Sequence, residues 1–201
     1  MPMDVELLFR LLIVGIYAVF AAIRIAYRLP ASQREEGEQR EPPRVAIVAM
    51  SFGIIGYFII LILYLIYVPL ILWFTLPLPS IVRWIGVITA ILCVPTLYWI
   101  HTTLDKQYSA QLEIQEDHNL IEIGPYRKVR HPMYTVFIVF LVGIALVTTN
   151  LLGFIFSLLI SCSFPSVAKT EEAMLTETFG DEYRSYMERT GRFLPPLRSS
   201  S

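Results

Sequence analysis

A polar run rich in reactive side chains stands between two long apolar stretches of this chain. It reads Gly124-Pro-Tyr-Arg-Lys-Val-Arg-His-Pro-Met-Tyr134, so two arginines, a lysine, a histidine and two tyrosines lie close together. Ionisable side chains beside lipid are costly unless they bind something, so function is the default interpretation of such a run. Two adjacent carboxylates, Glu171 and Glu172, follow after one further apolar block.

The segment Arg130-His131-Pro132 marks the point where the chain re-enters an apolar stretch. Pro132 suits the first position of a helix, and the free backbone N–H groups of that first turn can face an anionic ligand group such as a carboxylate or phosphate. A second interpretation stays open. The cations then only anchor the helix to lipid headgroups, and Tyr126 and Tyr134 belong to an aromatic belt.

Glu171 and Glu172 also have two interpretations. Carboxylates near a helix start are usually solvated and mildly favoured by the helix dipole. If the last apolar hairpin returns to the same face, however, it brings both carboxylates toward the basic run. A site with cationic, anionic and aromatic groups at a lipid boundary suits a zwitterionic ligand that bears a positive centre.

Several site types lack their sequence signals. The chain has no Cys/His cluster of metal-ligand spacing, no phosphate-cradling glycine loop and no serine with a recognisable base. We therefore expect no metal site, and we expect neither a metalloprotease, a nucleotide hydrolase nor a serine hydrolase. Cys93 and Cys162 fall inside apolar windows and are interpreted as small hydrophobic residues.

The elements that must position these residues are membrane helices. Of the 201 residues, 55% are hydrophobic, which exceeds what a soluble domain of this size carries. The sequence predicts an all-α integral membrane protein with about five transmembrane helices, a cofactor-binding loop and C-terminal helices. Residues 1–104 are expected to form a scaffold of three spans, and residues 105–201 the catalytic region.

The expected spans follow the apolar windows, and the last window needs a division. Three spans are predicted over Val5 to Tyr27, Val45 to about Leu72 and Ile81 to about Leu104. The block 132–168 is too long for one span and holds Thr148-Thr149-Asn150 near its middle, which predicts two short spans joined by a tight turn. A re-entrant hairpin is the alternative. In the tail, Gly180 is expected to end one helix and Asp181 to cap another.

The distribution of cations predicts the topology. Lysines and arginines crowd into the connector after the first span, the polar segment 105–131 and the tail, whereas Arg83 lies near the opposite side. An odd number of spans puts those three stretches on one face, and the positive-inside rule makes that face cytoplasmic. The sequence thus predicts a multi-pass protein with its active site on the cytoplasmic face.

At these residues the chain resembles a known family. The ordered set consists of Gln111, His118-Asn-Leu-Ile121, Gly124-Pro-Tyr126, Arg130-His-Pro-Met-Tyr134, Glu171-Glu172 and Phe179-Gly-Asp-Glu-Tyr183. It resembles the isoprenylcysteine carboxyl methyltransferases and the wider group of membrane methyltransferases that includes phospholipid methyltransferases. The resemblance covers roughly residues 105–195, and its specificity lies in the order and spacing of the fragments.

The resemblance implies S-adenosylmethionine as the methyl donor, a lipophilic or prenylated acceptor and membrane lipid as surroundings, with no nucleic acid partner. It assigns catalysis to Arg130, His131, Tyr134 and Glu172. It assigns cofactor contacts to Gln111, His118, Asn119, Leu120, Ile121, Tyr126, His131, Pro132, Met133, Tyr134 and Glu171.

One position departs from the family pattern and bears on the acceptor. Family members carry an arginine four residues before the first glutamate, where it is thought to meet the substrate, and this chain has Val167 there. A phospholipid N-methyltransferase is therefore the alternative enzyme. An amine acceptor would have to lose a proton first, for which Glu171, Glu172 or a tyrosine would be the base. A non-catalytic protein that holds anionic lipid headgroups is the alternative of another class.

Overall fold

The fold is described from a computed structural model, which describes residues 3–32, 41–66, 73–113 and 120–196. The helices are α1 (Met3–Ser32), α2 (Arg44–Leu65), α3 (Ser80–Glu113), α4 (Pro132–Thr148), α5 (Leu151–Phe179) and α6 (Asp181–Arg189), with a 3-10 turn η2 (Gly124–Arg127) before α4. The described residues contain helices and two isolated backbone bridges but no strand. The predicted all-α fold class is confirmed.

Among the described residues, four helices are long and apolar enough to cross a membrane, and the first three resemble the predicted windows. They cover Val5–Tyr27, Arg44–Leu65, Ser80–Leu104 and Leu151–Phe179. The fifth apolar helix, α4, has 17 residues, which is the lower limit for spanning. The chain is thus a multi-pass integral membrane protein.

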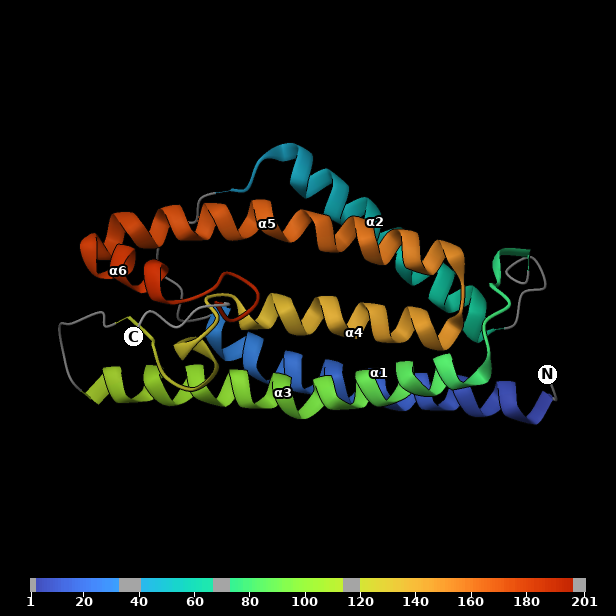
Figure 1. The fold of residues 1–201 in the computed structure, drawn as a ribbon. Helices are drawn as coiled ribbons and strands as arrows, with labels where there is room; N and C mark the ends of the chain where they lie inside the picture. The colour runs from blue at the N-terminus through green and yellow to red at the C-terminus, as the bar shows by residue number, and fades with distance from the viewer. Residues whose placement is uncertain (1–2, 33–40, 67–72, 114–119, 197–201) are drawn as a thin grey trace.

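The helices pack lengthwise into a bundle (Figure 1). Helix α4 lies between α5 and α3, α2 lies along α5, and α1 lies along α3. Two glycines let α3 and α4 approach closely, because a Cβ on Gly86 would lie 2.5 Å from the carbonyl oxygen of Gly143. Small residues at such crossings are the usual means by which membrane helices gain packing contacts.

The predicted turn in the last apolar block is confirmed. Thr149 takes a left-handed conformation with φ 49°, and Asn150 caps α5 by accepting a hydrogen bond from the Gly153 N–H at 3.2 Å. The two helices of this hairpin differ from the prediction in length, since α5 does not stop near Ala168 but continues for 29 residues. Both glutamates therefore lie on the spanning helix itself.

The tail divides at Gly180 as predicted, with φ 57° at this residue. The predicted capping role of Asp181 is wrong. Gly180 holds the N-cap position of α6 and no side chain caps it. Asp181 is the first helical residue and accepts a hydrogen bond from Arg184 at 2.9 Å.

Of the three polar stretches that the charge distribution placed on one face, the described parts of 105–131 and of the tail meet at one end of the bundle, whereas most of the connector after the first span lies outside the described residues. The end of α3, the starts of η2 and α4, the end of α5 and helix α6 all lie there (Figure 1). The opposite end holds a separate ion pair between Arg83 of α3 and Glu6 of α1. The fold therefore separates two charged regions by the length of the spans.

Candidate functional site

A backbone pairing fixes the start of α4 against the C-terminal segment. The N–H groups of Arg130 and His131 donate to the carbonyls of Gly191 and Arg192 at 2.9 and 3.0 Å, and the Gly191 N–H donates to Lys128 at 3.0 Å. Gly191 is required here, since a Cβ would lie 1.7 Å from the Leu194 carbonyl oxygen. Residues about sixty positions apart are thereby held in parallel.

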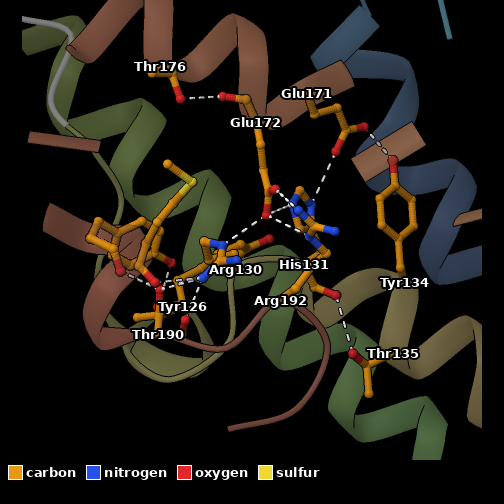
Figure 2. Close-up of polar contacts among 12 residues, drawn as sticks. Tyr126, Arg130, His131, Tyr134, Thr135, Glu171, Glu172, Thr176, Thr190 and Arg192 are labelled. Atoms are coloured by element: carbon orange, nitrogen blue, oxygen red, sulfur yellow. Dashed lines mark hydrogen bonds and ion pairs between the residues drawn. The ribbon is translucent and has the colours of Figure 1, made fainter. Parts of the chain in front are cut away.

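Glu172 is the centre of the charged cluster that this pairing creates (Figure 2). Its Oε1 accepts hydrogen bonds from Arg130 Nε at 2.9 Å and from Arg192 Nε at 3.1 Å, and its Oε2 accepts one from the Arg192 guanidinium. The Glu172 side chain is only 7% exposed. Two cations thus offset the cost of burying this carboxylate.

The Arg130 side chain forms its hydrogen bonds with other parts of the protein. Its guanidinium also donates to the backbone carbonyls of Met187, at 3.0 Å, and Thr190. These contacts connect the start of α4 to the end of α6. The geometry gives Arg130 and Glu172 a positioning role for the residue between them, His131.

His131 lies against both glutamates and is buried. Its Nδ1 is 3.2 Å from Glu171 Oε2 and its Nε2 is 3.3 Å from Glu172 Oε1. The Nε2 contact lacks hydrogen-bond geometry, so within the described part of the chain this buried nitrogen has no hydrogen-bond partner. The Glu171 carboxylate is 43% exposed and accepts a hydrogen bond from the Tyr134 hydroxyl. Glu171, which is partly exposed, thus retains capacity to bind a ligand, and His131 lies directly beside it.

Aromatic rings border this pair. The Tyr134 ring is stacked near the His131 ring, with centroids 5.6 Å apart, and stacks on Phe164 of α5 at 4.8 Å. These contacts fix the face of α4 that carries Tyr134. Ring faces beside a carboxylate suit a ligand that bears a positive centre.

Tyr126 is held through its backbone. Its carbonyl accepts a hydrogen bond from the Tyr186 hydroxyl at 2.6 Å. Burial, together with the nearby Glu122 carboxylate, raises the pKa of Tyr186 to about 12, so that this hydroxyl keeps its proton and remains a donor at neutral pH. Burial also raises the pKa of Tyr126 above its ordinary value. Tyr126 and Tyr186 are therefore uncharged at neutral pH.

The structure brings five of the thirteen predicted site residues into direct contact. Arg130, His131, Tyr134, Glu171 and Glu172 form one contact network. Pro132 is the first residue of α4, as predicted. The Met133 sulfur accepts a hydrogen bond from Arg24 of α1 at 3.4 Å. The catalytic and cofactor-binding roles assigned to these residues stay predictions.

Other predicted cofactor contacts are not part of this network. Leu120 and Ile121 are half-buried in the segment that leads to η2. Gln111 lies on the last turns of α3, but its side chain, like His118 and Asn119, is outside the described residues.

Sequence reasoning missed the contribution of the C-terminal segment. Arg192 was counted only as one of the cations that set the topology, yet it binds Glu172. Thr190 and Tyr186 were also not singled out, although both hold η2 or Arg130 in place. No local sequence pattern marks these contacts, because they depend on the backbone pairing of Gly191 with the start of α4.

The residues present fit a zwitterionic sulfonium cofactor. Glu171 offers a half-exposed carboxylate for an ammonium or sulfonium group, and the N–H groups of the first turn of α4 suit a carboxylate. Both kinds of group lie within one cluster at the end of the bundle. The chemistry of this donor set matches the charges of an amino-acid moiety.

Comparisons with known proteins point to the same half of the chain. Residues 84–177 match the isoprenylcysteine carboxyl methyltransferase (ICMT) family. A protein-S-isoprenylcysteine O-methyltransferase of Schizosaccharomyces pombe is 35% identical over 81 residues, which are 40% of this chain and 34% of that protein. A probable protein-S-isoprenylcysteine O-methyltransferase of Oryza sativa subsp. indica is 33% identical over 86 residues, 42% of this chain and 45% of that protein.

A relative with a different name also matches. The nickel-cobalt-cadmium resistance protein NccN of Alcaligenes xylosoxydans xylosoxydans is 34% identical over 79 residues, 39% of this chain and 37% of that protein. The chain thus covers between a third and a half of the length of these relatives. In the part of the chain that the structure describes, no three His, Cys, Asp or Glu residues group to hold a metal ion.

Proposed function

We propose that this chain is a membrane methyltransferase that uses S-adenosylmethionine to methylate the carboxylate of a lipophilic, prenylcysteine-like acceptor. Residues 84–177 match the isoprenylcysteine carboxyl methyltransferase family, which supports the proposal. The observation that carries the proposal is the cluster of His131, Tyr134 and Glu171 at the end of the spans. It joins a half-exposed carboxylate, a buried imidazole with an unpartnered nitrogen and an aromatic face.

The cofactor supplies a methyl group on a positively charged sulfur, and the transfer is an in-line displacement. The protein's task is then alignment and exclusion of water rather than covalent chemistry. Glu171 would bind the positive charge of the cofactor and His131 its carboxylate. Arg130, Glu172 and Arg192 would keep His131 in place, because they connect α4, α5 and the C-terminal segment.

The charges near the site favour a carboxylate acceptor over an amine. The guanidinium of Arg24 lies within reach of Met133 and 5.5 Å from the centroid of the Phe137 ring. A cation at this point would attract a carboxylate and would repel an ammonium group. In this proposal Arg24, which comes from α1, takes the substrate-binding role that Val167 cannot fill. A carboxylate nucleophile also needs no general base.

We place the site on the cytoplasmic face. Support comes from the cations of the described polar stretches, which gather at this end of the bundle, and from the positive-inside rule. The soluble cofactor would enter from the cytoplasm, and the acceptor would arrive from the bilayer.

A labelled-methyl assay tests the proposal. The purified protein is incubated in nanodiscs with S-adenosylmethionine labelled in its methyl group and with a farnesylated cysteine analogue or phosphatidylethanolamine. We expect the label to appear on the farnesylated cysteine and to be released by base, because a methyl ester is hydrolysed by base. The Arg24→Gln variant should transfer at least tenfold less label to this acceptor. Label on phosphatidylethanolamine alone would support the N-methyltransferase. No labelled product and no cofactor binding would support a non-catalytic headgroup-binding protein.

A further inference from the structure

A cavity of about 390 Å³ lies beside the first turns of α4. Its walls come from α3, η2, α4 and the C-terminal segment, and they include Thr96, Trp99, Pro125, Val136 and Phe193. The volume is in the range that small-molecule sites occupy. The walls are largely apolar, so the cavity suits a hydrocarbon chain.

The cavity lies on a different face of α4 from the candidate methyl-transfer cluster. Tyr134 and Phe137 are directed toward Phe164 of α5, with ring centroids 4.8 and 6.4 Å away. Pro132 and Val136, in contrast, line the cavity together with residues of α3. The cavity and the Tyr134 side of the cluster thus lie on different faces of α4. Phe193, which lines the cavity, packs near the His131 ring at a centroid distance of 6.1 Å.

Two cations complete the cavity. Arg127 and Lys128 line it and are exposed. Within the described part of the chain, neither side chain has an ion pair with a carboxylate. The α3 residues of the cavity belong to the last three turns of the Ser80–Leu104 span, and Trp99 is 53% exposed. Apolar walls below a pair of cations at the end of a span match the shape and charge of a lipid anion.

We propose that this cavity binds one anionic phospholipid, with an acyl chain between α3 and α4 and the phosphate beside Arg127 and Lys128. The lipid would contact η2 and residues 193–195 at once. These are the segments next to the backbone pairing that brings Arg130 and Arg192 to Glu172. The lipid would thus stabilise the positioning network.

The test compares lipid retention in variants by native mass spectrometry. Protein in detergent is mixed with dioleoylphosphatidylglycerol or dioleoylphosphatidylcholine, which have the same chains but differ in net charge. We expect one phosphatidylglycerol per chain to be retained in preference to phosphatidylcholine. The double variant Arg127→Gln/Lys128→Gln should lose on the order of 30-fold of that preference, since each cation near an anionic lipid contributes about a factor of five.

A matched control and a second variant distinguish a built site from general attraction. Lys169→Gln/Arg184→Gln removes two exposed cations from the same end but outside the cavity, and it should retain the lipid like the original chain. Thr96→Phe fills the cavity and should lower retention while both cations remain.

Equal retention of the two lipids, or an Arg127→Gln/Lys128→Gln variant that matches its control, would overturn the lipid site. So would undiminished retention in Thr96→Phe. Because retention is read without methyl transfer, these outcomes are independent of the proposed catalytic function.

Discussion

The two ends of the bundle each carry a charged cluster, and within the described residues the central ion pairs of these clusters differ in how completely internal partners surround them. At the end away from the candidate site, Arg83 donates to both oxygens of Glu6, to the Tyr64 hydroxyl at 2.8 Å and to the Val147 carbonyl at 2.8 Å. Its guanidinium also lies 3.9 Å from the centroid of the Phe9 ring. Among the described residues, Arg83 is thus surrounded by internal partners.

The cluster at the other end divides into two parts. Glu172 is surrounded by Arg130 and Arg192, much as Glu6 is held by Arg83. Glu171, one residue earlier, is 43% exposed and shares a contact with His131, whose Nε2 has no hydrogen-bond partner within the described residues. A buried ion pair that is surrounded by internal partners, such as Glu172 with its arginines, connects helices structurally. The neighbouring pair of Glu171 and His131 is more exposed and is a candidate for ligand binding.

The largest expected effect is on stability, at the end that carries Arg83 and Glu6. Arg83→Ala leaves Glu6 without its main partner and should lower the free energy of unfolding by about 3–5 kcal/mol. Thermal unfolding in detergent measures the change. The double variant Glu6→Gln/Arg83→Met should recover part of the loss, since it removes both charges. A single variant as stable as the original chain would contradict the structural role of the pair.

Glu172→Ala should lower both the stability of the protein and its affinity for the cofactor. It leaves Arg130 and Arg192 without their shared carboxylate, but Arg192 is 39% exposed and can be rehydrated. We expect a loss of about 2 kcal/mol in unfolding free energy, together with weaker cofactor binding because His131 loses its support. Calorimetry and thermal unfolding on the same sample measure both. A variant that loses neither would show that Glu172 does not position the site.

Tyr134→Phe should affect binding only. The phenylalanine ring preserves the stacking on Phe164 but cannot donate a hydrogen bond to Glu171. Cofactor affinity should fall by about three- to tenfold, the effect of one hydrogen bond, and the melting temperature should stay nearly constant. Unchanged affinity would mean that Tyr134 acts only through its ring.

The smallest effect is expected at an exposed ion pair of the same end. Arg184 and Asp181 pair at 2.9 Å, with side chains that are 64% and 93% exposed. Arg184→Ala should change the unfolding free energy by less than about 0.5 kcal/mol and leave cofactor affinity unchanged. A clear loss of affinity would show that α6 contributes to the site beyond the contacts described.

The sequence predicts the fold well because long apolar runs mark the spans. The distribution of charged residues indicates which polar stretches lie at the same end of the bundle. The length of α5 could not be predicted in the same way. The continuous apolar run ends near Ala168, but the residues that follow include good helix formers such as Glu171, Glu172 and Met174, so the helix continues without interruption.

The site is predictable only in part for a related reason. Proximity of Arg130 and the two glutamates follows from the antiparallel α4–α5 hairpin. The second cation, Arg192, depends on the backbone pairing at Gly191, which is a tertiary contact with no local pattern. The half-exposed state of Glu171 and the full burial of Glu172 likewise come from packing, since the two residues have the same side chain.

Calorimetric titration with S-adenosylmethionine tests most directly whether the pair of Glu171 and His131 belongs to the cofactor site. The titration is made on the original chain, on Glu171→Ala and His131→Ala, and on Arg184→Ala as the control. We expect at least tenfold weaker binding to the first two variants, as the loss of a charged contact implies, and unchanged binding to the control. Undiminished binding to both Glu171→Ala and His131→Ala, in folded protein, would contradict the placement of the site.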